Sequence, residues 1–320
     1  MQQRRNQSGY EEGDVCVHGA RMHYLHAGAG QPMLLIHGLV GSSTNWLQNI
    51  HALAEHRSVY AIDQMNMGES QRVAGIAADL ESTADRIAAM MTALGIEQAD
   101  IAGHSHGGAV SLMLAARHPE RVRSLILFAP ANPFSELSDL LVRVYSTPVG
   151  GLIARCAPYM PTPLQRFALG RMYGDPARIH EGCLEGYIGG LRAAGTVSHI
   201  LAIVRGWFQD MAKLKAALRS VAAVPTQLVW GDSDRAVSLA SGRALNRELP
   251  SSTLTVLPGG GHIVFEEMPE ESNRVMLEWL QRDAASTLPP SLKPARLRDQ
   301  TPRSVAVAAR GASALHPLAG

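Results

Sequence analysis

The sequence has few cysteines, which limits the kinds of site it can contain. Its three cysteines, Cys16, Cys156 and Cys183, lie far apart, and none has the C-x-x-C spacing of a metal or redox motif. An odd number also excludes a fully paired disulfide framework. We therefore expect unpaired, buried thiols and no metal site.

An excess of charge of either sign is also missing. The 29 Lys and Arg residues almost cancel the 28 Asp and Glu residues. Such a chain has no overall field that would attract nucleic acid or an anionic membrane. We therefore expect no nucleic-acid partner, and the substrate need not be charged.

Long hydrophobic runs are absent too. No apolar stretch approaches the roughly 20 residues that cross a bilayer, because Arg143 and Arg155 interrupt the most apolar region. The first residues, MQQRRNQSGYEEGD, lack the apolar segment of a signal peptide. These absences predict a cytoplasmic protein with no stable membrane span.

What the sequence does contain is an alternation of β-rich runs and helical patterns. Strands are expected at 33–38, 58–63, 99–105, 121–130, 225–231 and 252–259. Helical spacing separates most of them, which is typical of an α/β fold with a mostly parallel sheet flanked by helices. The alternation stops between about 132 and 222, where Leu, Ala, Arg and Pro predict a cap of short helices.

These patterns divide the chain into four parts. Residues 1–14 are expected to form an N-terminal arm, 15–131 with 223–283 the α/β core, 132–222 the helical cap, and 284–320 a tail. The tail is rich in Pro, Ala, Arg and Ser and has almost no aromatic residues. Such a composition buries too little apolar surface to fold, so we expect the tail to be disordered.

A nucleophile motif lies between a predicted strand and a predicted helix. Residues 103–107, Gly-His-Ser-His-Gly, match G-x-S-x-G in the context that gives this motif its meaning. A serine on such a sharp turn has a strained backbone, and small residues two positions before and after it avoid collisions. Gly103 and Gly107 meet this need, so we predict that Ser105 is a nucleophile.

A serine hydroxyl needs a base, and the base needs a carboxylate. His262 follows three glycines and a predicted strand, a position that lets an imidazole approach the serine. Two candidates for the carboxylate, Asp232 and Asp234, follow the strand at 225–231. Because an aspartate near a turn commonly caps that turn, we favour Asp234 over Asp232. The order Ser, Asp, His is the α/β-hydrolase order.

Two backbone N–H groups should stabilise the oxyanion that forms during attack. The residue after the nucleophile, His106, supplies one donor. Leu39, in the segment His37-Gly38-Leu39 at a strand end, suits the second. Since both donors are main-chain groups, the side chains of His106 and Leu39 are free to shape the pocket. For the ring of His37 we expect a structural role.

Five segments together resemble a known superfamily. HGLVGSS, DQMNMGES, GHSHGG, WGDSDRAVS and GGGHIVFEEMPEE, in this order and spacing, are similar to the α/β hydrolases, in their lid-bearing esterase and lipase-like branch. The resemblance covers about 15–283 apart from the cap. It implies an α/β-hydrolase fold with a helical cap inserted after the sixth strand, and Asp234 as the acid. Asn66 stands where the family usually has glycine, but asparagine tolerates a positive φ.

The expected reaction is hydrolysis of a carboxylic ester through an acyl-enzyme, without a cofactor. Cap residues such as Tyr159 and Trp207 suit an apolar acyl or alkyl group, so the expected partner is a small apolar ester-like substrate. Lactone opening, C–C bond cleavage, perhydrolysis and acyl transfer use the same triad and stay open. So does a binding protein without activity, since a fold does not fix a function. The sequence does not indicate an oligomeric state.

Overall fold

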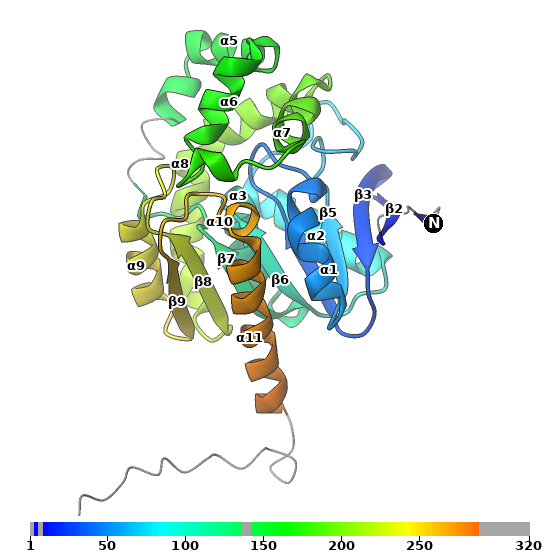
Figure 1. Ribbon diagram of the computed structural model, residues 1–320. Helices are drawn as coiled ribbons and strands as arrows, with labels where there is room; N and C mark the ends of the chain where they lie inside the picture. Colours follow the sequence, from blue (N-terminus) through cyan, green and yellow to red (C-terminus); the bar gives the residue numbers. More distant parts are fainter. Residues whose placement is uncertain (1–2, 6–8, 136–141, 288–320) are drawn as a thin grey trace, which may run out of the picture. The chain divides into compact units, whose positions relative to one another are not determined.

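A nine-stranded sheet lies at the centre of the fold in the computed structural model, which describes residues 3–5, 9–135 and 142–287. The strand order is β1-β2-β3-β5-β4-β6-β7-β8-β9 (Figure 1). The strands are β1 (Gln3–Arg5), β2 (Glu11–Val17), β3 (Ala20–Ala27), β4 (Pro32–Ile36), β5 (Ser58–Ile62), β6 (Ala99–His104), β7 (Val122–Phe128), β8 (Thr226–Gly231) and β9 (Ser252–Leu257). From β5 to β9 all neighbours are parallel, while β1, β2 and β3 pair antiparallel at one edge. The predicted mostly parallel sheet is confirmed.

Helices flank the sheet on both faces. The core helices are α1 (Leu47–Ala54), α2 (Leu80–Ala93), α3 (His106–Arg117), α9 (Leu239–Glu248), α10 (Val264–Glu267) and α11 (Pro269–Thr287), with 3-10 turns η1 (Ser43–Trp46) and η2 (Pro119–Arg121). Central strands covered on both faces need apolar residues at every position, not at alternate ones. This explains why the runs that predicted β4, β6 and β7 are continuously apolar.

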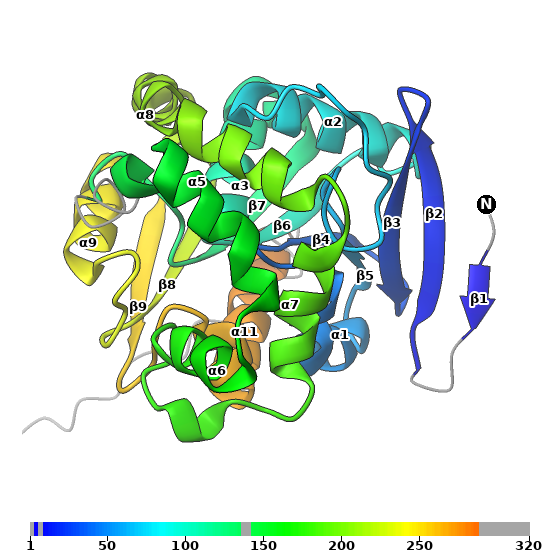
Figure 2. The same cartoon turned by 90° about the horizontal axis from the view of Figure 1, so that it is seen from above.

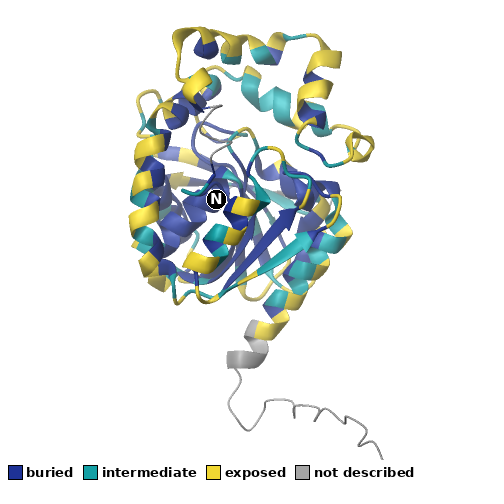
Figure 3. Ribbon diagram, turned by 90° about the vertical axis from the view of Figure 1, so that its left-hand side faces the viewer, coloured by how far each residue is buried: buried dark blue, intermediate teal, exposed yellow. Residues whose placement is uncertain are grey.

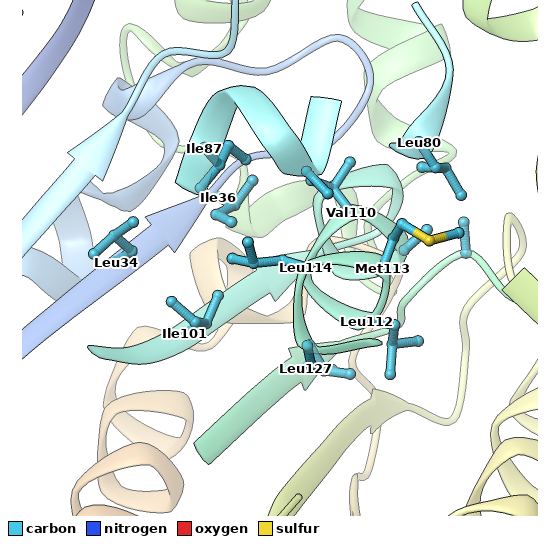
Figure 4. Close-up of a cluster of buried hydrophobic side chains, with 14 of the residues drawn as sticks. Leu34, Ile36, Leu80, Ile87, Ile101, Val110, Leu112, Met113, Leu114 and Leu127 are labelled. Carbon is cyan, nitrogen blue, oxygen red and sulfur yellow. The ribbon is translucent and has the colours of Figure 1, made fainter. Parts of the chain in front are cut away.

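Alternate residues of each central strand belong to two different cores. Leu34 and Ile36 of β4 pack with side chains of α2 and α3, as Figure 4 shows for this cluster. Met33 and Leu35 point to the opposite face and join the cluster of α1, α10 and α11. Because side chains along a strand alternate between faces, the two cores together hold the ends of β4 and β6 in fixed positions.

The cap lies above the carboxyl ends of the parallel strands (Figures 1 and 2). Its elements are α5 (Pro148–Cys156), η3 (Ala157–Tyr159), α6 (Thr162–Gly170), η4 (Pro176–Arg178), α7 (Cys183–Arg192) and α8 (Thr196–Val221). The long helix α8 connects cap and core, since its buried residues, among them Ile203, Leu214 and Leu218, join the same cluster as α3. Among the described helices, none alone is long and apolar enough to cross a membrane; α7 and α8 reach that measure only as a pair bent by 90°.

The cap follows β7, which is the sixth strand when the three-residue strand β1 is left out of the count, as the resemblance implied. The structure differs from the sequence-based expectations at two other boundaries. The arm at 1–14 contains β1 and the start of β2, and these two strands pair antiparallel with Gln3 opposite Gly13. The helix α11 continues to Thr287, and the rest of the expected tail, 288–320, lies outside the described residues.

Candidate active site

Ser105 occupies the sharp turn between β6 and α3. Its backbone has φ of 51°, a conformation that non-glycine residues rarely adopt. The turn is held because the Ser105 amide donates to the carbonyl of Phe128 at 3.0 Å and its own carbonyl accepts from Ala131 at 2.9 Å. A Cβ atom added at Gly107 would collide with the carbonyl oxygen of His37, and one at Gly103 with the hydroxyl of Ser111. The two glycines are therefore needed for the reason that the motif suggests.

His262 connects the serine to a carboxylate. Its Nε2 lies 3.0 Å from Oγ of Ser105, and its Nδ1 lies 2.9 Å from Oδ2 of Asp234. The Asp234 side chain is fully buried, and its other oxygen accepts from the amides of Ala236 at 2.8 Å and Val237 at 2.9 Å. With both oxygens occupied, the carboxylate has one orientation. The three residues predicted from sequence thus lie in one hydrogen-bonded chain.

Asp232 caps a turn, which is the alternative role that the sequence left open for it. This residue is exposed, and its Oδ1 accepts from the amide of Gly259 at 2.8 Å. Asp232 therefore joins the turn after β8 to the turn after β9 by a hydrogen bond. It makes no hydrogen bond to His262 among the interactions of the described residues.

Both predicted oxyanion donors lie beside Ser105. His106 is the next residue in the chain and begins α3. Leu39 follows Gly38, where an added Cβ would lie 3.4 Å from Cβ of Ser105. Within the described part of the chain, neither the Leu39 amide nor the His106 amide donates to another backbone group. Two amides are therefore free for an oxyanion at the nucleophile.

His37 fixes the Leu39 loop, as expected. Its Nδ1 donates to the Gly38 carbonyl at 2.7 Å, and its Nε2 accepts from the amide of Gln64 at 3.1 Å. This pair of bonds requires a neutral ring with its proton on Nδ1. Complete burial lowers the pKa of His37, which favours the same neutral form.

His104 contacts His262, the predicted base, and this contact could not be predicted from the sequence. Its Nε2 donates to the carbonyl of His262 at 3.1 Å, and the centres of the two rings are 4.8 Å apart. Burial, followed by the charge of His262, holds the pKa of His104 well below its usual value. A neutral His104 can therefore support the base without repelling its charged form. In the sequence it is merely a variable position of G-x-S-x-G.

Glu267 ties the loop of His262 to the cap. Its buried carboxylate accepts from the amides of Gly261 at 2.7 Å, Gly174 at 3.0 Å and Asp175 at 2.9 Å. Next to it, the amide of His262 donates to the carbonyl of Met172 at 2.7 Å. Three of these hydrogen bonds cross to the segment after α6, and the fourth joins Glu267 to the loop of the base. In the sequence, Glu267 is one of four glutamates in GGGHIVFEEMPEE, and nothing distinguishes it from the others.

A second buried carboxylate, Glu266, also connects core and cap. It accepts from the hydroxyls of Tyr173 at 3.1 Å and Tyr187 at 2.9 Å, and from the thiol of Cys183. Asn45 of η1 contributes a fourth contact at 3.3 Å. Burial and then the charge of Glu266 raise the pKa of Cys183 to about 12, so this thiol stays protonated and donates. Glu266 thus accepts from three neutral donors of the cap, namely Tyr173, Cys183 and Tyr187.

The imidazole of His106 stands out in the site. It is buried, at 1% exposure, and within the described residues both of its ring nitrogens lack a hydrogen-bond partner. Burial, followed by the charges of His37 and His199, lowers the pKa of His106 to about 3. The ring is therefore neutral at physiological pH and offers one donor and one acceptor immediately after the nucleophile.

The two cap aromatics that we expected near the substrate differ. Trp207 on α8 is buried in the cluster shared with α3. Tyr159, in contrast, is 71% exposed on the outer side of the cap, so it does not line the site. The difference in exposure could not be predicted from the sequence, because both residues are aromatic and lie in helical segments.

The described residues contain no group of three or more His, Cys, Asp or Glu side chains that could hold a metal ion. His262 and Asp234 are instead hydrogen-bonded to each other, and His37 and His104 to backbone groups, whereas the ring of His106 has no partner among the described residues. The chemistry that the arrangement supports is nucleophilic attack by an activated serine, with two amides ready for the developing negative charge.

Comparisons with known proteins agree with the α/β-hydrolase fold. The family described as alpha/beta hydrolase fold matches residues 31–171. A dihydrolipoyllysine-residue acetyltransferase component of an acetoin cleaving system from Pseudomonas putida is 33% identical over 254 residues. That match covers 79% of this chain but only 64% of the relative, so the chain spans slightly less than two thirds of its length.

Two further matches extend over most of both chains. A 2-hydroxy-6-oxo-2,4-heptadienoate hydrolase from Pseudomonas putida is 29% identical over 84% of this chain and 96% of its own. Among solved structures, a membrane phospholipase A described as a bacterial virulence factor superposes with a TM-score of 0.70 at 26% identity, over 87% of each chain. The relatives thus share a fold and differ in the bonds that their names say they cleave or form.

Proposed function

We propose that this chain, which has the α/β-hydrolase fold, is a serine hydrolase that cleaves a carboxylic ester through an acyl-enzyme. The observation that carries the proposal is the continuous hydrogen-bonded chain from Ser105 through His262 to Asp234. A hydroxyl 3.0 Å from an imidazole that is itself oriented by a buried carboxylate is an activated nucleophile. The two free amides beside it complete the requirements for acyl transfer.

The proposed reaction has two halves. Ser105 attacks the ester carbonyl while His262 takes the hydroxyl proton, and the amides of Leu39 and His106 stabilise the oxyanion. His262 then returns the proton to the leaving alcohol, and an acyl group stays on Ser105. Water, deprotonated by His262, attacks this acyl-enzyme in the second half and frees the carboxylic acid. Asp234 stabilises the imidazolium in both halves.

An apolar acyl or alkyl group fits the surroundings of this site. The helix α8 covers α3 with buried Ile200, Val204 and Trp207, all of which belong to the apolar cluster. Support for an ester also comes from the name of the phospholipase A structure, because a phospholipase A acts on an ester of an apolar acid. We accordingly propose a small apolar ester-like substrate.

A second candidate, hydrolysis of a C–C bond, is favoured by one observation. The relative named 2-hydroxy-6-oxo-2,4-heptadienoate hydrolase, 29% identical, is matched over 96% of its own length. The arrangement of Ser105, His262 and Asp234 suits either reaction, since one constellation can serve different chemistries.

Labelling and a substrate panel test the proposal. We expect a fluorophosphonate to form a covalent adduct on Ser105 and on no other residue, and the Ser105→Ala variant to lose both the adduct and ester turnover. Removal of a triad nucleophile typically lowers kcat by a factor on the order of 10⁴–10⁶. An unlabelled, well-folded protein would instead support a binding protein without activity.

The panel should contain p-nitrophenyl esters of increasing chain length together with a vinylogous 1,5-diketone acid. Turnover of the esters, with a length preference that changes in Trp207→Ala, is expected for the ester hydrolase. If only the diketone is cleaved, the second candidate replaces the first. Labelled Ser105 with neither activity would point to acyl transfer, since the acyl-enzyme would then need another acceptor.

A further inference from the structure

Exposed large hydrophobic side chains gather on the cap. Among the described residues there are nine such side chains, and eight of them belong to the cap. The eight are Val144, Val149, Leu152, Ile153, Tyr159, Leu164, Phe167 and Phe208. We call the part of this set on α5, η3 and α6 the outer cap face. A contiguous exposed apolar area on a globular protein usually marks a binding surface.

The helix α5 exposes its large apolar side chains, whereas an ordinary surface helix buries them. Val149, Leu152 and Ile153 are spaced i, i+3 and i+4, so they share one face, and they are 69%, 63% and 45% exposed. The residues that α5 buries are Gly150 and Gly151. Packing within the chain therefore uses the small residues of this helix, and its large apolar residues stay outside.

The neighbouring elements continue the same face. Leu164 and Phe167 of α6, three residues apart, are 48% and 67% exposed, and Tyr159 of η3 is 71% exposed. Figures 1 and 2 show α5 and α6 in the outer layer of the cap, on the side away from the sheet. In Figure 3 these cap helices are mostly coloured as exposed. The described residues of unit 1–280 leave these side chains exposed.

Positive charge predominates on the segments of the outer cap face, while the neighbouring helix α7 carries the exposed Glu185. Between positions 143 and 178 the chain has five arginines and a single acidic residue, Asp175. The arginines are Arg143, Arg155, Arg166, Arg171 and Arg178, and all are exposed. A hollow beside the start of α5 is lined by Arg155 and Arg205 together with Leu152. Positive groups thus border the apolar side chains.

We propose that the outer cap face docks on a lipid surface that contains anionic phospholipids. Apolar side chains at helical spacing with arginines at their edge are the pattern of a segment that lies in a membrane interface. The long arginine side chains reach the headgroup phosphates while the apolar residues enter the acyl region. The proposal concerns binding and does not depend on the reaction catalysed at Ser105.

The charges favour lipid over a second copy of the chain. A twofold dimer through this face would place the same arginines against one another, which costs electrostatic energy. An anionic membrane supplies both the apolar environment and the opposite charge. The near-zero net charge of the whole chain conceals this local surplus, because the balancing acidic residues lie elsewhere.

Vesicle binding of the full chain tests the proposal. We expect co-sedimentation with vesicles of equal parts phosphatidylglycerol and phosphatidylcholine, weak binding to phosphatidylcholine alone, and release at high salt because salt screens the contacts. The double variant Leu152→Ser with Phe167→Ser should bind at least about tenfold more weakly, given the apolar area that it removes. Retention of ester turnover and melting temperature in this variant shows that it is folded.

A charge pair provides the matched control. Arg166→Glu with Arg171→Glu on the cap should also lower binding by about tenfold or more, since each basic residue near an anionic surface contributes about 1 kcal/mol. The same change at exposed Arg243 and Arg247 of α9 should leave binding unchanged. Equal loss from both pairs, or wild-type binding by the serine variant, would overturn the proposal. A concentration-dependent dimer that the serine variant abolishes, without vesicle binding, would overturn it in favour of self-association.

Discussion

Nε2 of His104 donates a hydrogen bond to the carbonyl oxygen of His262, with the two atoms 3.1 Å apart. The residue just before the nucleophile therefore holds the backbone of the base. On its other side, the amide of His262 is bound to Met172 at 2.7 Å. The imidazole thus has both of its flanking peptide groups fixed, one by the core and one by the segment after α6. A base held in this way approaches the serine in one geometry.

Loss of the His104 bond should affect the reaction more than substrate binding. We expect His104→Ala to lower kcat by about 10- to 100-fold with little change in KM, since a misplaced base weakens the transition state. His104→Gln keeps an N–H donor at a similar position and should recover most of kcat. Steady-state kinetics on one ester checks both variants. If alanine and glutamine lose activity equally, the contribution is packing and not the hydrogen bond.

The two aspartates after β8 should differ strongly. Asp234→Asn removes the charge that stabilises the imidazolium and changes its tautomer, so kcat should fall by at least about 10³. Asp232→Asn changes only an exposed bond to Gly259 and should lower kcat less than about threefold. A phosphonate-labelling rate measured on both variants checks the ranking independently of substrate choice. The opposite ranking would move the acid to Asp232.

Acid should destabilise the protein through His106. The folded-state pKa of about 3 lies below the usual 6.5, so below pH 6.5 the unfolded chain binds a proton that the folded chain does not. The stability from this group is present above pH 6.5 and is lost as pH falls toward 3. Between pH 7 and pH 5 the loss is about 2 kcal/mol.

Urea unfolding at the two pH values measures this effect. His106→Gln, which cannot titrate in this range, should reduce the pH-dependent change in unfolding free energy by about 2 kcal/mol. Exposed His56→Gln is the matched control and should keep the wild-type change. The comparison uses differences within each variant, so an overall stability change from the substitution does not affect it. If His106→Gln showed the same change in unfolding free energy between pH 7 and pH 5 as the wild type, the His106 ring would have to be protonated or solvated in the folded protein.

Glu267 should matter for both stability and catalysis. Glu267→Ala leaves the buried amide of Gly261 and the part-buried amides of Gly174 and Asp175 without their acceptor, and a buried unpaired group costs about 1–3 kcal/mol. We expect a loss of about 2 kcal/mol or more in unfolding free energy and a lower kcat in the folded fraction. Glu270→Ala, at an exposed position of α11, is the control and should change stability by less than about 1 kcal/mol. If Glu267→Ala and Glu270→Ala lowered the unfolding free energy by similar amounts, water would have to replace the Glu267 carboxylate as the acceptor.

The candidate triad and the strands of the core were accessible from the sequence because local rules determine them. Gly103 and Gly107 are required by the turn at Ser105, and the collisions that an added Cβ would cause there confirm the reason. Asp234 and His262 follow strands whose ends must meet at one edge of a parallel sheet. Continuous apolar runs likewise specify strands buried on both faces. Each of these inferences uses only neighbours in sequence or in a regular ladder.

The sequence did not reveal which residues fix the base and which side of the cap faces outward. His104 and His262 are 158 residues apart, and Glu267 accepts from amides of the cap that are 93 and 92 residues away in the chain. Val149 and Leu152 resemble core residues by type, and only the packing of Gly150 and Gly151 against the chain shows that they are exposed. Hydrogen bonds and burial depend on how distant segments pack, whereas residue type and spacing are properties of the sequence alone. The sequence therefore determined the candidate catalytic residues, and the tertiary structure decided which residues support them and which surface the cap presents.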